Sequence, residues 1–238
     1  GKGILEKNNT VIRSYIDEIS GKIKLSRKLK IVTDCMNGSA GLVIPQIIKN
    51  MGCEHISIYD KADGNFPTHE PDPSNPKNLF ELIRKVKENN ADIGIAYDGD
   101  ADRLGIVDKY GNTLSGDYII GLIYPEANKN GIKNILFEIK CSQAIIDFVE
   151  QKGGRLILTP TGHSVIKERM VKEGIKIGGE YSGHLFFLDE YYGFDDAIYA
   201  SLRVLRVLSQ ENETIKDMLS RIPEYYSSPE YRVECKDE

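Results

Sequence analysis

The sequence predicts an α/β fold made of two similar domains, each with a mixed, mainly parallel sheet flanked by helices. Short apolar runs alternate with amphipathic stretches of helical length along most of the chain. The alternation restarts after the turn signal at 110–112, so we expect the same architecture twice. The 238 residues suffice for two units of ~110 residues each, and we place these domains at 1–112 and 113–238.

In the first half, apolar residues at helical spacing predict a helix before the first buried strand. The positions that mark its apolar face are Val11, Ile12, Tyr15, Ile16 and Ile19. Strands are then expected over 29–34, 55–60, 91–98 and 104–108, with helices from the Asn37-Gly38 turn through Ile48 and over 76–88. Three prolines within 66–73 predict a rigid loop there.

The second half repeats this order. Helices are expected from about Gly116 and over 144–149, 164–171 and 194–208, and strands over 134–139, 155–160, 176–179 and 184–188. In such folds, ligands bind in the crevice outside the carboxyl ends of the strands. The loops that follow the strands are therefore the places to look for chemistry.

Composition excludes several classes of protein. Lys and Arg number 31 against 36 Asp and Glu, a net charge of −5, which argues against a nucleic-acid partner but permits a local basic pocket for one phosphorylated small molecule. No apolar run reaches the ~20 residues that span a bilayer, and the first residues lack a secretory signal, so no membrane partner is expected. The four cysteines lie far apart, which favours a reduced, cytoplasmic protein. A start at Gly rather than Met suggests a piece of a longer chain.

The strongest local signal is the segment DGDADR at 98–103, directly after an apolar strand. Asp98, Asp100 and Asp102 stand at alternate positions, so their carboxylates can converge on one hard cation such as Mg²⁺. Without a cation these negative charges repel, and Arg103 offsets only one of them. The plainer interpretation is a solvated acidic turn.

Two other interpretations of this segment can be tested on the sequence. An EF-hand counted from Asp98 requires Gly and Glu where the chain has Arg103 and Lys109, so it fails twice. A phosphatase that uses Asp98 as its nucleophile stays open, although that chemistry does not require the third Asp or the Arg.

The segment GGEYSGH at 178–184 lies between two short predicted strands. Glu180, Ser182 and His184 stand at i, i+2 and i+4, so in an extended loop they project to the same side. Glu and Ser can hydrogen-bond vicinal sugar hydroxyls, and His can exchange a proton near neutral pH. A Gly-rich hairpin with a structural His is the alternative.

Two further candidates follow strands in the second half. TPTGHS at 159–164 opens a helix, where backbone N–H groups favour an anion and His163 adds charge, although an N-capping turn explains it equally. Lys140, in FEIKCS, could extend a cation into the same cleft, whereas a lone Lys is ordinarily exposed to solvent.

Together with FPTHEPDP and YGFDDAIY, these motifs occur in an order that resembles the α-D-phosphohexomutase family, and most closely its bacterial phosphomannomutase/phosphoglucomutase branch. The resemblance implies the second and third of four domains in an enzyme that transfers phosphate from a phosphoserine to a hexose phosphate, through a hexose 1,6-bisphosphate intermediate. It implies that the three aspartates hold Mg²⁺ and that Arg103 contacts the transferring phosphate. It also implies that Lys140, His163 and the loop Glu180, Tyr181, Ser182, Gly183 and His184 bind the phosphorylated hexose. Lys140 or His184 is then the candidate for proton transfer.

The family's nucleophile loop, of Thr-Ala-Ser-His-Asn-Pro type, and its phosphate clamp, of Arg-Ser-Gly-Thr-Glu type, do not occur in these 238 residues. We therefore expect the chain alone to lack mutase activity and to require domains 1 and 4 of the same polypeptide. Tyr181 stands where the glucosamine branch commonly has Gln, which disfavours an amino-sugar substrate. Because the remaining residues of the loop suit both glucose and mannose, the resemblance predicts dual use of these two sugars. The competing hypothesis is a non-catalytic module that binds metal or sugar phosphate.

Overall fold

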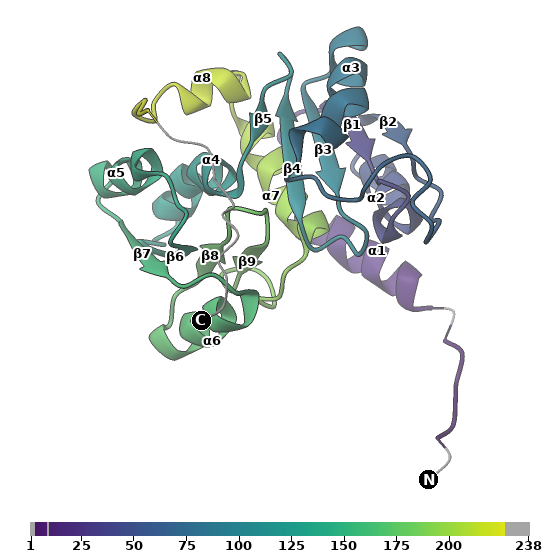
Figure 1. The fold of residues 1–238 in the computed structure, drawn as a ribbon, viewed down its shortest axis with the longest axis horizontal. Helices are drawn as coiled ribbons and strands as arrows, with labels where there is room; N and C mark the ends of the chain where they lie inside the picture. The colour runs from purple at the N-terminus through teal and green to yellow at the C-terminus, as the bar shows by residue number, and fades with distance from the viewer. Residues whose placement is uncertain (1–2, 9, 227–238) are drawn as a thin grey trace, which may run out of the picture.

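The computed structural model describes residues 3–8 and 10–226, which form two sheets flanked by helices (Figure 1). The first sheet has the order β2-β1-β3-β4-β5. Its strands are β1 (Lys30–Asp34), β2 (Glu54–Ile58), β3 (Ile93–Tyr97), β4 (Leu104–Asp108) and β5 (Thr113–Leu114). β1 pairs in parallel with β2 and β3, whereas β4 is antiparallel to both β3 and β5. The first sheet is therefore evenly mixed rather than mainly parallel.

The second sheet repeats this plan with the order β7-β6-β8-β9. Its strands are β6 (Asn134–Glu138), β7 (Arg155–Thr159), β8 (Ile177–Gly179) and β9 (Leu185–Phe187). β6 pairs in parallel with β7 and β8, and β9 runs antiparallel to β8. In each sheet the first strand of the half lies between the second and third. The predicted α/β class is confirmed.

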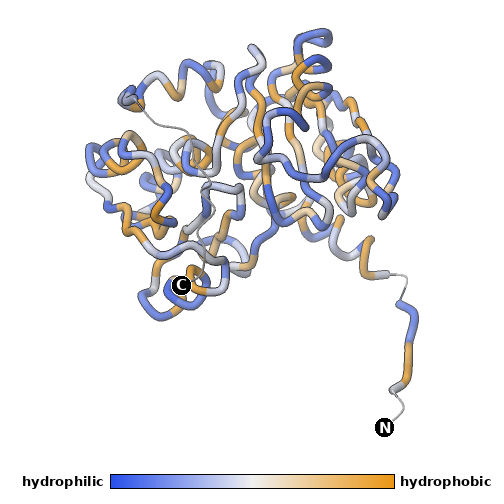
Figure 2. Tube along the Cα trace, in the orientation of Figure 1, coloured by the Kyte–Doolittle hydropathy of each residue, from blue (hydrophilic) through white to orange (hydrophobic). Residues whose placement is uncertain are grey.

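Helices cover the faces of both sheets. The first half contributes α1 (Val11–Lys22), η1 (Ser39–Leu42), α2 (Ile44–Asn50), η2 (Pro76–Leu79) and α3 (Phe80–Glu88). The second half contributes α4 (Gly116–Lys129), α5 (Gln143–Gln151), α6 (His163–Glu173), α7 (Ala197–Gln210) and α8 (Ile215–Leu219). α3 packs on β1, β3 and β4, and α6 packs on β6 and β8. Figure 2 shows hydrophobic residues concentrated along the strands and on helix faces.

The largest hydrophobic cluster is continuous between the two halves. It runs from Ile31 and Ile95 of the first sheet to Ile135 and Phe187 of the second. α7 connects them, because it contacts β3 and β4 as well as β9. Tyr97 of β3 is fully buried, and its hydroxyl lies 2.8 Å from Ser201 Oγ of α7. The predicted division at 112 and 113 stays a prediction, since this core joins the two predicted domains.

Several boundaries differ from the expectation. α7 begins at Ala197 rather than 194, because Gly193 has a φ of +84° and the Asp196 side chain caps the helix by accepting from the Tyr199 N–H. The expected helix through Ile48 is divided into η1 and α2. β5 and α8 are additional elements that the sequence patterns did not predict. The end of the predicted second domain, where we expect the start of a linker to domain 4, falls in residues 227–238, which lie outside the described residues.

The cysteines and the helix lengths can be compared with what the composition predicts. Cys35, Cys53 and Cys141 are free thiols there, and Cys235 lies outside them. Among the helices of residues 3–8 and 10–226, none has the length and apolarity needed to cross a membrane.

Candidate active site

The aspartate loop 98–103 follows β3 and turns back into β4. Asp98 is only 2% exposed, and its Oδ1 accepts from the backbone N–H groups of Asp102 and Arg103 at 3.0 and 3.1 Å. Its Oδ2 accepts from Arg103 Nε at 2.7 Å. Burial raises the pKa of Asp98 to about 6, although the hydrogen bonds from Arg103 oppose the rise. The carboxylate thus fixes the tight turn from within.

The three aspartates fit a divalent cation. One oxygen from each of Asp98, Asp100 and Asp102 lies within 4.8 Å of the others, and Asp100 is exposed. Oxygen-only donors of this kind suit a hard cation such as Mg²⁺. The convergence expected from the sequence is therefore present in the geometry.

Neighbouring loops of the first half hold the aspartate loop in place. The Ser39 N–H donates to the Gly99 carbonyl at 2.9 Å, and a Cβ added at Gly38 would lie 2.7 Å from that same oxygen. Arg103 Nη1 donates to Asp72 Oδ1 at 3.0 Å. The proline-rich segment, predicted as no more than a rigid loop, therefore orients the guanidinium of Arg103.

The sugar loop, which we define as residues 180–184, joins β8 to β9. Glu180 is buried, and its Oε2 lies 2.7 Å from His184 Nδ1, which is also 3.2 Å from Ser182 Oγ. His184 Nε2 lies 3.3 Å from Asp102 Oδ1. Burial disfavours the charged imidazole, but the hydrogen bonds to Asp102 and Glu180 outweigh it and raise the pKa of His184 to about 9. His184 thus stands between the aspartate loop and the carboxylate of the sugar loop.

Backbone contacts join the same two loops. Arg103 and His184 form an antiparallel β-bridge, and the Leu104 N–H donates to the Gly183 carbonyl at 3.1 Å. Gly183 has a φ of +103°, and a Cβ there would lie 2.5 Å from the Leu104 carbonyl oxygen. Glycine is therefore required at this position for the two halves to approach so closely.

His163 lies beside this group. Its Nδ1 is 3.6 Å from Asp195 Oδ2, and its ring centroid is 6.1 Å from that of His184. Asp195, Asp102 and His184 also offer atoms within 4.8 Å of one another. His163 therefore lies near His184, which itself contacts Asp102 of the aspartate loop.

Lys140 connects to the sugar loop through its neighbours. Its Nζ lies 3.8 Å from Glu138 Oε1 and 5.9 Å from the centroid of the Tyr181 ring, and its side chain is 41% exposed. This exposure leaves the ammonium accessible to an anion. Lys140 thus approaches the sugar loop through its contacts with Glu138 and Tyr181.

Three acidic residues of this region were not assigned a role from the sequence: Asp72, Glu138 and Asp195. Asp72 orients Arg103, and Asp195 pairs with His163 and with Lys167 Nζ at 3.0 Å. Asp195 lies in a segment whose aromatic residues suggest packing. Glu138 is fully buried at the end of an apolar strand. A charged residue in so apolar a run was the available signal.

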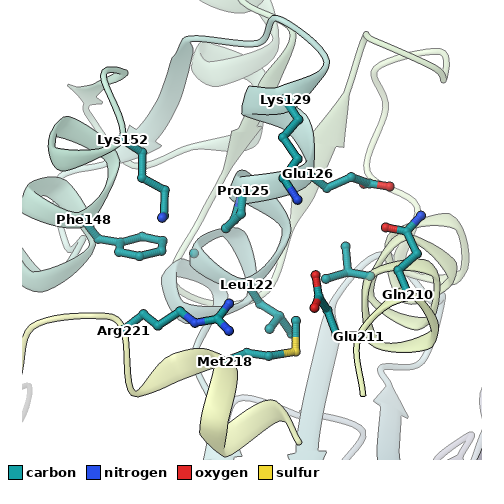
Figure 3. A pocket seen from close by; sticks show the side chains of 12 residues that line it. Leu122, Pro125, Glu126, Lys129, Phe148, Lys152, Gln210, Glu211, Met218 and Arg221 are labelled. Atoms are coloured by element: carbon teal, nitrogen blue, oxygen red, sulfur yellow. The ribbon is translucent and has the colours of Figure 1, made fainter. Parts of the chain in front are cut away.

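Two hollows of the structure differ in how they lie relative to this site. The cavity in Figure 3 lies among α4, α5, α7 and α8 and encloses about 80 Å³. Within the part of the chain that the structure describes, its lining includes none of the predicted site residues, and its volume is below the ~300 Å³ of ordinary ligand pockets. A groove of about 370 Å³ borders Asp100 and Ala101, between α1 and the segment 194–198. The larger hollow thus adjoins the aspartate loop.

Known proteins share this architecture. Residues 13–111 match the model of phosphoglucomutase/phosphomannomutase alpha/beta/alpha domain II, and residues 115–226 match that of domain III. The chain is 42% identical over its full length to a phosphomannomutase/phosphoglucomutase of Pseudomonas putida, spanning 51% of that protein. It is 39% identical over 92% of its length to a phosphoglucomutase of Neisseria gonorrhoeae, spanning 48% of it.

A solved structure agrees with this result. The crystal structure of a phosphoglucomutase/phosphomannomutase family protein from Burkholderia thailandensis aligns with a TM-score of 0.90 and 38% identity, covering 96% of this chain and 50% of that one. The chain thus spans about half the length of the relatives that it matches. By sequence and by structure, it belongs to the phosphoglucomutase/phosphomannomutase family, in which it corresponds to domains II and III.

Proposed function

We propose that this chain supplies the metal-binding and sugar-binding parts of a mutase that interconverts hexose 1-phosphate and hexose 6-phosphate. The substrates would be glucose and mannose phosphates, converted through a phosphoserine enzyme and a hexose 1,6-bisphosphate intermediate. The single observation that carries the proposal is the contact between His184 and Asp102. It joins the aspartate loop, whose carboxylates suit a cation, to the sugar loop, whose side chains suit sugar hydroxyls. Family membership supports the same reaction class.

Asp98, Asp100 and Asp102 would hold Mg²⁺, which would supply positive charge to the phosphoryl group during transfer. Arg103 presents a guanidinium whose direction is fixed by Asp98 and Asp72, a geometry that suits a phosphate oxygen. The cation and the guanidinium would thus face the same anionic group.

The sugar loop would bind the ring. Glu180 and Ser182 offer an acceptor and a hydroxyl to vicinal sugar hydroxyls, and His184, held by two carboxylates, would exchange a proton with the attacking or leaving hydroxyl. Lys140 would offer an ammonium and His163 an imidazole N–H to the phosphate that is not being transferred, and Lys140 is the second candidate for proton transfer. Because the sugar must bind in two orientations, contacts to hydroxyls common to both orientations suit this role.

A phosphatase with Asp98 as nucleophile receives less support from the geometry. Both carboxylate oxygens of Asp98 accept hydrogen bonds from within the aspartate loop, and the Asp98 side chain is buried. A nucleophilic carboxylate needs an oxygen free to approach phosphorus. Asp98→Asn in the parent chain separates the two: loss of phosphate hydrolysis, with an aspartyl phosphate trapped in the parent, would favour the phosphatase.

The experiment that tests the proposal compares the 238-residue chain with the complete polypeptide of its source. Each is incubated with glucose 1-phosphate or mannose 1-phosphate, Mg²⁺ and the corresponding 1,6-bisphosphate, and the 6-phosphate is measured. We expect turnover of both sugars by the complete polypeptide and none by the chain alone. Turnover by the isolated chain would contradict the requirement for further domains. Strong preference for glucosamine phosphate would contradict the sugar assignment, and a native product of 26.7 kDa would favour the non-catalytic module.

A further inference from the structure

Glu138 is a carboxylate buried where three loops of the second half meet. It ends β6, and its side chain is 1% exposed. Its Oε2 accepts from Thr161 Oγ1 at 2.6 Å, and its Oε1 accepts from the Tyr181 N–H at 2.5 Å. One side chain therefore connects the segment after β6, the segment after β7 and the sugar loop.

The ionic surroundings of Glu138 are sparse. Among the residues that the structure describes, Lys140 is the cation paired with it, with Nζ 3.8 Å from Oε1. A buried carboxylate is costly unless it is hydrogen-bonded and paired, so both hydrogen bonds and this ammonium contribute to keeping it in place. The same attraction acts on Lys140 and restricts where its exposed ammonium can lie.

The loops that Glu138 connects carry the predicted sugar-phosphate residues. Lys140 follows it by two residues, His163 follows Thr161 by two residues, and Tyr181 belongs to the sugar loop. Glu180 adds a second connection, since its Oε1 accepts from the Gly162 N–H at 2.9 Å. The two carboxylates together fix the segment 159–163 against the sugar loop.

We propose that Glu138 is a positioning residue for hexose phosphate binding, which holds the Lys140 ammonium and the registry of the two loops without touching the ligand. This inference deepens the proposed function and rests on it. Its proposed role has two parts. Its negative charge attracts the Lys140 ammonium, and its two hydrogen bonds hold the segment after β7 and the sugar loop.

Two substitutions separate these contributions. Glu138→Gln removes the charge but preserves both hydrogen bonds, because its carbonyl can accept from Tyr181 while its amide donates to the Thr161 hydroxyl, which is also an acceptor. Thr161→Val removes one hydrogen bond and leaves every charge in place. Glu150→Gln, at an exposed position of α5, is the matched control for loss of one negative charge.

The first measurement is binding of glucose 6-phosphate and mannose 6-phosphate to the 238-residue chain by isothermal titration calorimetry, with Mg²⁺ present. We expect Glu138→Gln to weaken binding about threefold, the effect of one partly exposed ion pair, and Glu150→Gln to leave it unchanged. Thr161→Val should weaken binding severalfold, and it carries the test if the Gln variant fails to fold. Equal affinities for the parent chain and both site variants would overturn the proposal.

The second measurement needs no ligand. It therefore distinguishes failure of the positioning role from failure of the proposed function. The resonances of the Lys140 side chain and the exchange rate of the Tyr181 amide are recorded by NMR in each variant. We expect the Lys140 signals to move in Glu138→Gln and not in Glu150→Gln, while the Tyr181 amide stays protected. Displaced Lys140 signals in a chain that binds no sugar phosphate would retain the Glu138–Lys140 contact and count against sugar-phosphate binding by this part of the enzyme. Unmoved Lys140 signals would refute the positioning role itself.

Discussion

His184 Nε2 lies 3.3 Å from Asp102 Oδ1, so an imidazole of the second half faces a carboxylate of the first. The β-bridge between Arg103 and His184 fixes this approach at the backbone, and Glu180 holds the opposite edge of the ring. The aspartate loop and the sugar loop are therefore one connected structure. A substitution in either loop should therefore alter the structure of the other.

His184→Gln should reduce turnover by the complete polypeptide without unfolding it. Gln can still donate to Asp102, but its amide cannot exchange a proton, and general acid–base groups contribute roughly 10²- to 10⁴-fold to rates. Steady-state kinetics should show the loss mainly in kcat. His55→Gln is the matched control, since His55 lies in β2 with Nε2 2.8 Å from Thr33 Oγ1. Similar rates for both variants would remove His184 from the chemistry.

Mg²⁺ should stabilise the chain through the three aspartates. A cation that binds only the folded state at a hundred times its Kd adds about 2.7 kcal/mol to the free energy of unfolding. Asp100→Asn should abolish most of this gain with little effect on the metal-free protein, because Asp100 is exposed. Thermal melts with Mg²⁺ and with EDTA measure both effects. Asp17→Asn, an exposed change in α1, should retain the full gain; an equal gain in Asp100→Asn would place the cation elsewhere.

Gly183→Ala should destabilise the contact between the two halves. The residue has a φ of +103°, which costs a non-glycine residue roughly 1–2 kcal/mol, and its Cβ would also collide with the Leu104 carbonyl oxygen. Gly131→Ala separates these causes, since Gly131 has a φ of +89° and a Cβ there would meet nothing within 4 Å among the described residues. Urea unfolding should therefore show a larger loss for Gly183→Ala. Equal losses would mean that the collision is relieved by movement.

Much of the fold was predictable because its elements have local causes. The apolar strands before the aspartate loop and before Lys140 could be identified from residue type alone, and both are present as β3 and β6. α7 was misplaced at its start because Asp196 acts as a cap, a role that depends on the neighbouring turn. α8 has only five residues, too few for a periodic pattern to show.

The site was predictable where one segment contains its chemistry and unpredictable where distant segments meet. The three aspartates are close in sequence, so their convergence could be inferred from spacing. Asp72 contacts Arg103 across 31 positions, and Glu138 contacts Tyr181 across 43. Such pairings depend on how strands are ordered in the sheets, which residue spacing does not encode.

The pairing of His69 with Asp34 should make stability depend on pH. Asp34 is fully buried, and His69 Nε2 lies 3.6 Å from its Oδ2. The neighbouring Asp34 carboxylate raises the pKa of His69 above its ordinary value, although burial opposes the rise. A raised folded pKa means that the folded state binds the proton more tightly. The resulting stabilisation is full below the unfolded pKa of about 6.5 and is lost as the pH rises through the folded value.

His69→Gln isolates this contribution. Gln cannot titrate, so the difference in unfolding free energy between the parent chain and the variant should shrink as the pH rises from 5.5 to 9. His55, whose pKa is lowered by burial, affects stability with the opposite sign. Because it is present in both proteins, its contribution to the unfolding free energy cancels in the difference. Urea unfolding at several pH values, in EDTA, measures it. A difference that stays constant with pH would show that His69 contributes through packing against Tyr59, with which its ring makes an edge contact at 5.5 Å, and not through the charge.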